Sequence, residues 1–149
     1  MPQLSQESDA MLMTCTSRII KVMRVVIIHI DYKVIFGHRG VDIQQVLFAE
    51  GKSTIDGVTK KSKHNFQPSQ AIDIAPYPVL WPDEQGISRE EALHRARRFD
   101  VLAGFVMGTA ASLGYNFRWG GDWDHDWTYN DQKFHDLGHF EDMDAGRLP

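Results

Sequence analysis

The sequence predicts an α+β fold in which helices pack on a small antiparallel sheet. The expected elements follow one another as helix, strand, helix, loop, strand, helix, strand, loop and strand, an order typical of this class. The chain has 149 residues, 42% of them hydrophobic and 24% charged, which suits a single domain over residues 1–149. The sequence contains neither a Gly-rich phosphate loop nor a Gly-x-Ser-x-Gly turn.

The amino-terminal region predicts an amphipathic helix over about residues 8–28, within a helical segment that extends to about residue 30. Its apolar residues recur at helical spacing: Met11, Cys15, Ile19, Val22, Met23 and Val26. Cys15 is the only cysteine, which excludes an internal disulfide framework and a Cys-rich zinc module. We expect it to be a small buried residue in a protein made in a reducing compartment.

A short strand and a second helix are expected next. Residues 33–36 are rich in β-forming residues. Asp42 and Gln45 have the spacing of a capping box, and Gly51 is expected to end the helix that follows. One face of this helix is marked by Ile43, Val46 and Leu47.

The second half of the chain predicts three strands and the longest helix. The strands are expected at residues 71–75, 115–119 and 138–141. Ser88 and Glu91 form another capping-box pattern before the helix, and Gly114 ends it. The apolar face of this helix consists of Leu102, Phe105, Val106, Thr109, Ala110 and Leu113.

Charge and hydropathy restrict the partners of the protein. The formal net charge is −4 and no basic stripe is present, so nucleic acid is not an expected ligand. The polar start does not resemble a secretory signal, and the most apolar run, residues 22–30, is far shorter than the ~20 residues of a membrane span. We expect a monomer that is synthesised in the cytoplasm without a signal peptide and does not insert into membranes.

Two separated segments contain residue types that bind zinc. His64 and Asp73 are nine positions apart, and His139 lies on the last expected strand. A catalytic zinc site needs three nitrogen or oxygen ligands and one open position. Asp73 stands between two isoleucines, and a carboxylate in a buried strand needs a partner or a metal. The residues alone leave open whether each histidine is a ligand or an ordinary packed or surface residue.

Two carboxylates near His139 have alternative roles. Asp136 can accept a proton from a metal-activated water and pass it to a leaving amine, or it can be a solvated loop residue. Glu141 is expected on the same strand face as His139. It can orient that ligand, bind substrate or lie at the surface.

The loop before the last strand contains regularly spaced oxygen ligands. The alternating positions, which resemble the early ligands of a calcium loop, are Asp122, Asp124, Asp126, Thr128 and Asn130. Trp127 occupies the position of the usual glycine and Lys133 that of the bidentate glutamate, so a Ca²⁺ site and an acidic loop lining the cleft both remain open. The following residues are expected in the core or the cleft wall rather than in a carbohydrate platform: Trp81, Trp119, Trp123 and Trp127.

Several motifs occur together in a fixed order. The central ones are Ser62-x-His64, then Pro68-Ser69-x-Ala71-x-Asp73-Ile74-Ala75-Pro76-Tyr77, and finally Asp136-x-x-His139-Phe140-Glu141. They are accompanied by Gly37-His38-Arg39-Gly40, Gln44-Gln45 and residues 48–53 upstream, and by Trp119-Gly120-Gly121-Asp122-Trp123. Over residues 37–141 this set resembles the zinc D-alanyl-D-alanine carboxypeptidase and L-alanyl-D-glutamate peptidase family, and within it the phage endolysins.

The resemblance implies a Hedgehog/DD-peptidase-like fold and a bacteriolytic zinc peptidase that hydrolyses the peptidoglycan stem peptide, at the L-alanyl-D-glutamate bond. It implies these zinc ligands: His64, Asp73 and His139. By the same match Asp136 is the catalytic base, Arg39 binds a substrate carboxylate or polarises the scissile carbonyl, and Ser62 contacts substrate.

Two alternatives remain, namely a D-alanyl-D-alanine carboxypeptidase or dipeptidase and a non-catalytic zinc-binding module. The presence of Asp136 beside three ligands argues against the second alternative, because a closed structural site needs no base. An endolysin of this kind would act on the cell wall after holin-type release. The commoner family pattern has the first histidine and the aspartate seven positions apart, so the shape of residues 65–70 is the least predictable part of the site.

Overall fold

A four-stranded antiparallel sheet in the order β1-β2-β4-β3 organises the molecule, which confirms the predicted fold class. The computed structural model describes residues 1–147. The strands are β1 (Tyr32–Phe36), β2 (Ala71–Pro76), β3 (Phe117–Trp119) and β4 (His139–Asp142). Because β2 lies between β1 and β4, its backbone is paired on both sides.

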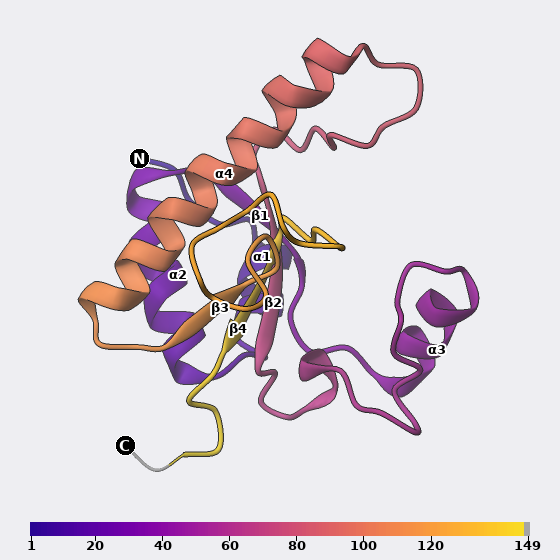
Figure 1. Cartoon of the computed structure of the whole chain (residues 1–149). Helices are drawn as coiled ribbons and strands as arrows, with labels where there is room; N and C mark the ends of the chain where they lie inside the picture. Colours follow the sequence, from indigo (N-terminus) through magenta and orange to yellow (C-terminus); the bar gives the residue numbers. More distant parts are fainter. Residues whose placement is uncertain (148–149) are drawn as a thin grey trace.

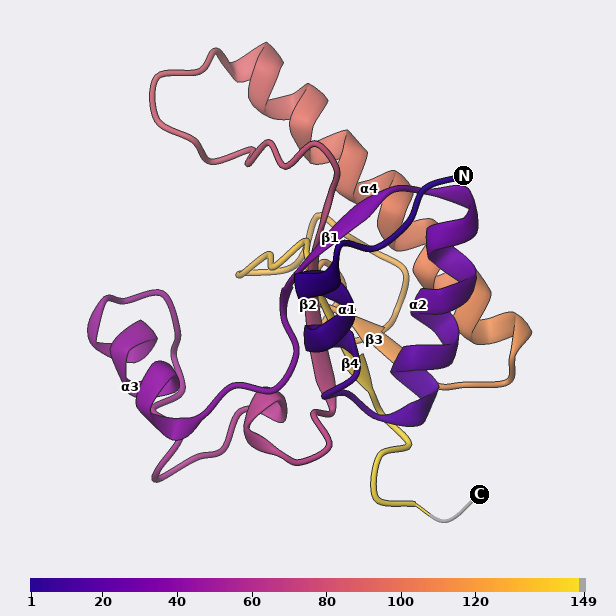
Figure 2. The same cartoon turned by 180° about the vertical axis from the view of Figure 1, so that it is seen from behind.

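Two helices pack together beside the sheet and enclose the core (Figures 1 and 2). They are α2 (Ser17–His29) and α4 (Arg89–Ser112). The shorter α1 (Gln6–Leu12) packs against β1. Fully buried side chains from these helices and from the sheet form the core, among them Ile19, Val22, Met23, Ile72, Ile74, Leu102, Val106 and Phe140.

The continuous helix predicted over residues 8–28 is wrong, because residues 13–16 separate α1 from α2. In this gap Cys15 forms an isolated parallel bridge with Ser69, and the N–H of Thr16 donates to the carbonyl of Ser69 at 2.9 Å. These long-range hydrogen bonds replace those that a continuous helix would make. Cys15 is buried, as predicted, and burial raises the pKa of its thiol to about 12.

The helix α3 (Val41–Ala49) forms where it was predicted, and Gly51 follows it with φ of 71°, a conformation that favours glycine. The predicted capping box of Asp42 and Gln45 is wrong. The helix begins two residues earlier than that box implies, with Gly40 as a cap that makes no side-chain hydrogen bond. Asp42 therefore lies in the first turn, where its charge still favours the helix dipole.

The apolar face predicted for α3 does not pack on the core. Ile43 is 45% and Val46 56% exposed, whereas the polar Gln44 is fully buried. Figures 1 and 2 show the reason, since α3 stands apart from the sheet on the side away from α2 and α4. Apolar periodicity predicted the helix correctly but not what it packs against.

The longest helix, α4, begins and ends as predicted. The hydroxyl of Ser88 accepts a hydrogen bond from the N–H of Glu91 at 3.1 Å, but the Glu91 carboxylate binds Arg95 at 2.7 Å, so only half of the capping box forms. Gly114, with φ of 74°, follows its end. No helix within residues 1–147 combines the length and the apolar character that a membrane span requires.

Gly138 allows the start of β4 to approach β2 closely. Its carbonyl accepts a hydrogen bond from Ile74 N–H at 2.9 Å, and a Cβ at this position would lie 2.5 Å from the carbonyl oxygen of Ile74. We expect Gly138→Ala to lower the free energy of unfolding by about 1–3 kcal/mol, as overpacking does, in urea denaturation. The control Gly104→Ala places its methyl group in open space within α4 and should raise stability by about 1 kcal/mol. Equal stability of the two variants would contradict this expectation.

Candidate metal centre

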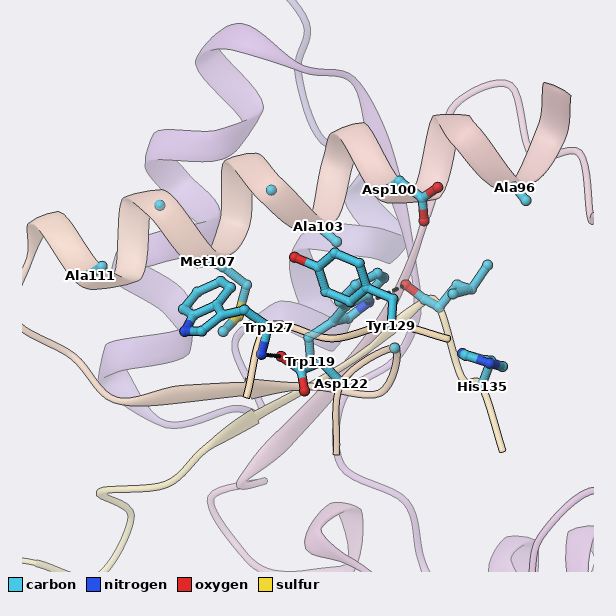
Figure 3. A pocket seen from close by; sticks show the side chains of 14 residues that line it. Ala96, Asp100, Ala103, Met107, Ala111, Trp119, Asp122, Trp127, Tyr129 and His135 are labelled. Carbon is cyan, nitrogen blue, oxygen red and sulfur yellow. Dashed lines mark hydrogen bonds between the residues drawn. The ribbon is translucent and has the colours of Figure 1, made fainter. Parts of the chain in front are cut away.

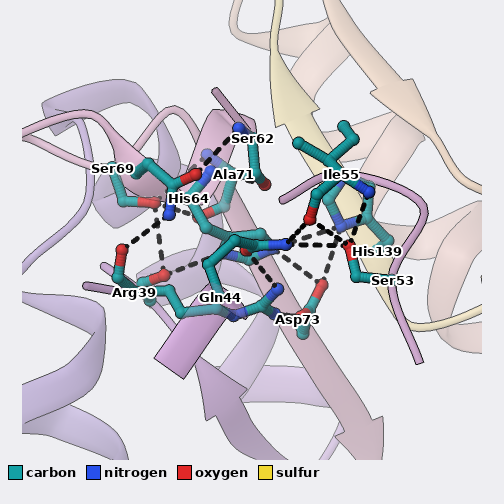
Figure 4. A network of polar contacts seen from close by, with 12 residues as sticks. Arg39, Gln44, Ser53, Ile55, Ser62, His64, Ser69, Ala71, Asp73 and His139 are labelled. Atoms are coloured by element: carbon teal, nitrogen blue, oxygen red, sulfur yellow. Dashed lines mark hydrogen bonds and ion pairs between the residues drawn. The ribbon is translucent and has the colours of Figure 1, made fainter. Parts of the chain in front are cut away.

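The pairing of β2 with β4 places Asp73 directly opposite His139. The third residue, His64, lies in the short 3₁₀ helix η1 (Lys63–Asn65) and is fully buried. Three donor atoms converge: His64 Nε2 lies 3.1 Å from Asp73 Oδ1 and 3.3 Å from His139 Nδ1, and the last two atoms are 2.8 Å apart. The predicted residues therefore come together from segments 66 positions apart in the chain (Figure 4).

The outer nitrogens of both imidazoles face hydrogen-bond acceptors. His64 Nδ1 lies 2.7 Å from the carbonyl oxygen of Gly37, and His139 Nε2 lies 3.1 Å from Glu141 Oε1. A carbonyl and a carboxylate accept only, so these nitrogens hold the protons. In the neutral rings, the inner nitrogens then present lone pairs to each other and to the Asp73 carboxylate. Three donors this close need a positive charge between them, either a metal ion or a proton on an imidazole.

The donor set fits zinc. Ligands about 2.0–2.1 Å from a tetrahedral zinc lie about 3.3 Å from one another, close to the 2.8–3.3 Å separations here. Protonation satisfies the same site without a metal. Burial would lower the pKa of His139, but hydrogen bonds to Asp73 and Glu141 raise it to about 10. A metal ion competes with that proton for the same lone pair.

Arg39 connects the metal centre to the segment around α3. Arg39 is 8% exposed, and its guanidinium donates to Asp73 Oδ2 at 2.8 Å and to Gln44 Oε1 at 3.1 Å. The Gln44 amide donates in turn to Ser53 Oγ and to the carbonyl of Ile55, both at 2.8 Å (Figure 4). Gln44 thus holds Arg39 in place from a helix that otherwise stands apart from the sheet.

We expect Gln44→Leu to destabilise the protein by about 1–3 kcal/mol, because buried donors and acceptors lose their partners. Loss of Arg39 positioning should also reduce kcat/KM about 10-fold or more. Chemical denaturation and peptide hydrolysis measure the two effects. The adjacent Gln45 is exposed, so Gln45→Leu is the matched control and should change neither. If both variants behave alike, Gln44 does not position Arg39.

Glu141 is buried and contacts the predicted ligand His139 rather than solvent. Arg118 donates to its other oxygen, Oε2, at 2.6 Å and 3.1 Å. Burial would raise the pKa of Glu141, but hydrogen bonds from His139 and Arg118 outweigh burial and hold the pKa below its ordinary value. A charged Glu141 fixes the ring of His139 with its lone pair toward Asp73, the arrangement that metal ligands need.

Asp136 precedes β4 and is mostly shielded from solvent. Its backbone N–H donates to Gly120 and its carbonyl accepts from His139 N–H, so both flanking segments fix its position. Burial raises the pKa of its carboxyl above the ordinary value, and the charge of Asp73 adds to this increase, while His139, His64 and Arg39 oppose it. These couplings place the carboxyl within the electrostatic field of the metal centre.

Two further predicted sites have local structural partners. The hydroxyl of Ser62 caps η1 by accepting from His64 N–H at 3.3 Å, which helps to position a ligand; contact with substrate stays a prediction. The carboxylates of Asp122, Asp124 and Asp126 lie within 4.8 Å of one another. Each accepts a hydrogen bond from within its own loop, which explains their clustering without an ion, and calcium stays a prediction.

Sequence reasoning missed Gln44 and Arg118 as parts of the site. A buried glutamine on a helix cannot be recognised from apolar periodicity, because the pattern of Ile43, Val46 and Leu47 does not include it. Arg118 lies across from Glu141 in the β3–β4 register, so alternation along two paired strands was the available signal.

Comparisons with known proteins concern the family and the fold of the chain. The model of a family described as phage L-alanyl-D-glutamate peptidase matches residues 1–143. The structure is similar to the crystal structure of the L-Ala D-Glu endopeptidase ChiX of Serratia marcescens, with a TM-score of 0.68 and 19% sequence identity over 95% of this chain and 90% of that chain. At this identity the likeness concerns the fold. A search of curated proteins finds no match.

Proposed function

Since the chain belongs to the phage L-alanyl-D-glutamate peptidase family, and is therefore a peptidase that acts on peptidoglycan, we propose that it is a zinc enzyme with these ligands: His64, Asp73 and His139. The observation that supports this proposal most strongly is the convergence of three lone-pair donors whose outer nitrogens are fixed by hydrogen bonds. A bound zinc ion would supply Lewis acidity for activating water and polarising the scissile carbonyl.

The residues around the ligands have separate tasks in amide hydrolysis. Asp136 accepts a proton from the attacking water and delivers it to the amine of D-glutamate as the bond to L-alanine breaks. Its raised pKa suits it to general acid–base catalysis, because it makes the carboxylate a stronger base for the proton of water and brings its pKa nearer to neutral pH. Glu141 keeps His139 oriented throughout.

Arg39 is proposed to bind a substrate carboxylate or to polarise the scissile carbonyl. Its guanidinium stays charged although it is buried, since it pairs with Asp73. Among the described residues, its Nε has no hydrogen-bond partner. The hydrogen bonds to Asp73 and Gln44 fix the charged guanidinium beside the predicted ligands, which supports electrostatic stabilisation of a substrate oxygen.

Mass spectrometry of purified peptidoglycan fragments, digested with and without a chelator, tests the proposal. New amino groups on D-glutamate are expected, and the chelator should prevent their release. Free D-alanine would instead indicate a D-alanyl-D-alanine carboxypeptidase. Cleavage that persists after metal removal would contradict the zinc mechanism. Holin-type release and a monomeric state, both expected from the sequence, stay predictions.

A further inference from the structure

A large cavity lies between α4 and the loop of residues 119–137, outside the metal centre (Figure 3). Its volume of about 640 Å³ falls within the ~300–1,000 Å³ of small-molecule sites. We propose that this cavity is a subsite for the N-acetylmuramyl sugar to which the stem peptide is attached. This assignment rests on the proposed function, because only cleavage beside L-alanine places that sugar next to the reaction.

The cavity adjoins the proposed base. His135 and Leu137, the two neighbours of Asp136 in the chain, line this cavity and also a smaller one of about 330 Å³ that contains Asp136 itself. In peptidoglycan the amino group of L-alanine is acylated by the lactyl group of N-acetylmuramic acid. The sugar is thus separated from the scissile bond by one residue, at most about 3.6 Å of chain, and the lactyl group.

The two walls of the cavity differ in a way that suits a pyranose. On α4, Gly104 and Gly108 lie one turn apart, and no atom lies within 4 Å of a Cβ at either position, so this wall is open. On the loop, Trp127 is 61% and Tyr129 50% exposed, and both rings face the cavity (Figure 3). Aromatic faces pack against the apolar face of a sugar ring, a contact that also excludes water.

One end of the cavity is polar. Asp100 from α4 and His135 from the loop line opposite walls on the same side of the cavity (Figure 3). A carboxylate and an imidazole offer acceptors and a donor for sugar hydroxyls and for an acetamido group. Because His135 precedes Asp136 directly, this polar end is the one nearer the reaction, where the lactyl side of the sugar must lie.

The loop holds Trp127 in an unfavourable backbone conformation. Its φ of 68° lies in the left-handed region, which bulky residues rarely adopt. The buried carboxylate of Asp122 maintains this geometry by accepting from the N–H groups of Trp127 at 3.0 Å and of Asp126 at 3.2 Å. Strain that the surrounding structure maintains is typical of residues placed for binding.

The smaller cavity fits the sugar less well. Its tryptophan, Trp81, stacks on Phe99, which also lines this cavity, with ring centroids 5.6 Å apart, so one face of the indole is already covered by protein. Its volume is about half that of the cavity next to Trp127. The two tryptophans therefore provide a matched pair for experiment.

The test compares hydrolysis of N-acetylmuramyl-L-Ala-γ-D-Glu-L-Lys with that of acetyl-L-Ala-γ-D-Glu-L-Lys. The wild-type protein should prefer the muramyl peptide in kcat/KM by about tenfold, as one good aromatic contact permits. Gly108→Leu fills the cavity from a helix position with open space and should bring the ratio of the two kcat/KM values close to one. Trp127→Ala should lower the ratio as well. Ser112→Leu, exposed on α4 outside the cavity, and Trp81→Ala should both keep it.

A second measurement does not depend on turnover. Titration of the metal-free protein with N-acetylmuramic acid should give a saturable change in tryptophan fluorescence, which Gly108→Leu abolishes. A ratio near one in the wild type, or a preference that survives Gly108→Leu, would overturn the subsite. If the wild type cleaves neither peptide, the proposed function fails. The titration still tests the subsite in that case, because an absence of N-acetylmuramic acid binding would overturn the subsite independently of hydrolysis.

Discussion

Asp136→Asn is expected to lower kcat for stem-peptide hydrolysis by about 10²–10⁴-fold, the usual contribution of a general base or acid. An amide cannot accept a proton from water or deliver one to the leaving amine, so both halves of the reaction slow. The zinc content and the fold should be retained, because Asp136 is not among the three convergent donors. Steady-state kinetics, metal analysis and thermal unfolding measure these effects.

The thermal stability of Asp136→Asn provides a second check. Burial raises the pKa of this carboxyl, so the folded state binds its proton more tightly than the unfolded state. Once the pH rises above this pKa, the carboxyl of Asp136 is charged and its charge destabilises the folded state. An asparagine side chain is neutral at every pH, so Asp136→Asn should not lower Tm at neutral pH. Asp131→Asn, at an exposed position of the same loop, is the control and should keep full activity. Wall lysis by Asp136→Asn at the wild-type rate would refute the mechanism.

His139→Asn should abolish both zinc binding and hydrolysis. In the wild type, zinc at 1,000 times its Kd would stabilise the folded state by about 4 kcal/mol. For a chain of this size that corresponds to a rise in Tm of about 10 °C. The variant should show no such rise, because one of three donors is missing.

Atomic spectroscopy and thermal unfolding with and without added zinc measure these effects. The control is His94→Asn, an exposed histidine on α4 that should keep the zinc-dependent rise in Tm. If His139→Asn binds zinc as tightly as His94→Asn does, the assigned ligand set is incorrect.

The sequence was most informative where chemistry and strand alternation coincide. Asp73 between two isoleucines required a buried partner, and the structure supplies Arg39 and two imidazoles. The two strands of the site were also predicted closely, because residues 71–75 are short and β-rich before Pro76 and Pro78, and residues 138–141 are a short segment that begins at a glycine. The likeness of the motifs to a known family then connected segments that spacing alone could not connect.

Long-range contacts explain the failures. The break at residues 13–16 results from pairing with Ser69, a partner more than 50 positions away that no local pattern indicates. Likewise, the exposure of Val46 and the burial of Gln44 depend on where α3 stands relative to the sheet. Helical periodicity identifies a face, but only the tertiary arrangement determines what covers it.

The direct pairing of Asp73 with His139 has a consequence for how such enzymes can diverge. The register of β2 and β4 fixes Asp73 and His139, and the hydrogen bonds of η1 and Gly37 fix His64. The number of residues between His64 and Asp73 therefore does not set the distance between their side chains. Insertions at residues 66–68 would then be tolerated, whereas a slip of one residue between β2 and β4 would turn a ligand to the opposite face. Motif searches with a fixed histidine–aspartate spacing would therefore overlook working relatives that a search on strand pairing would find.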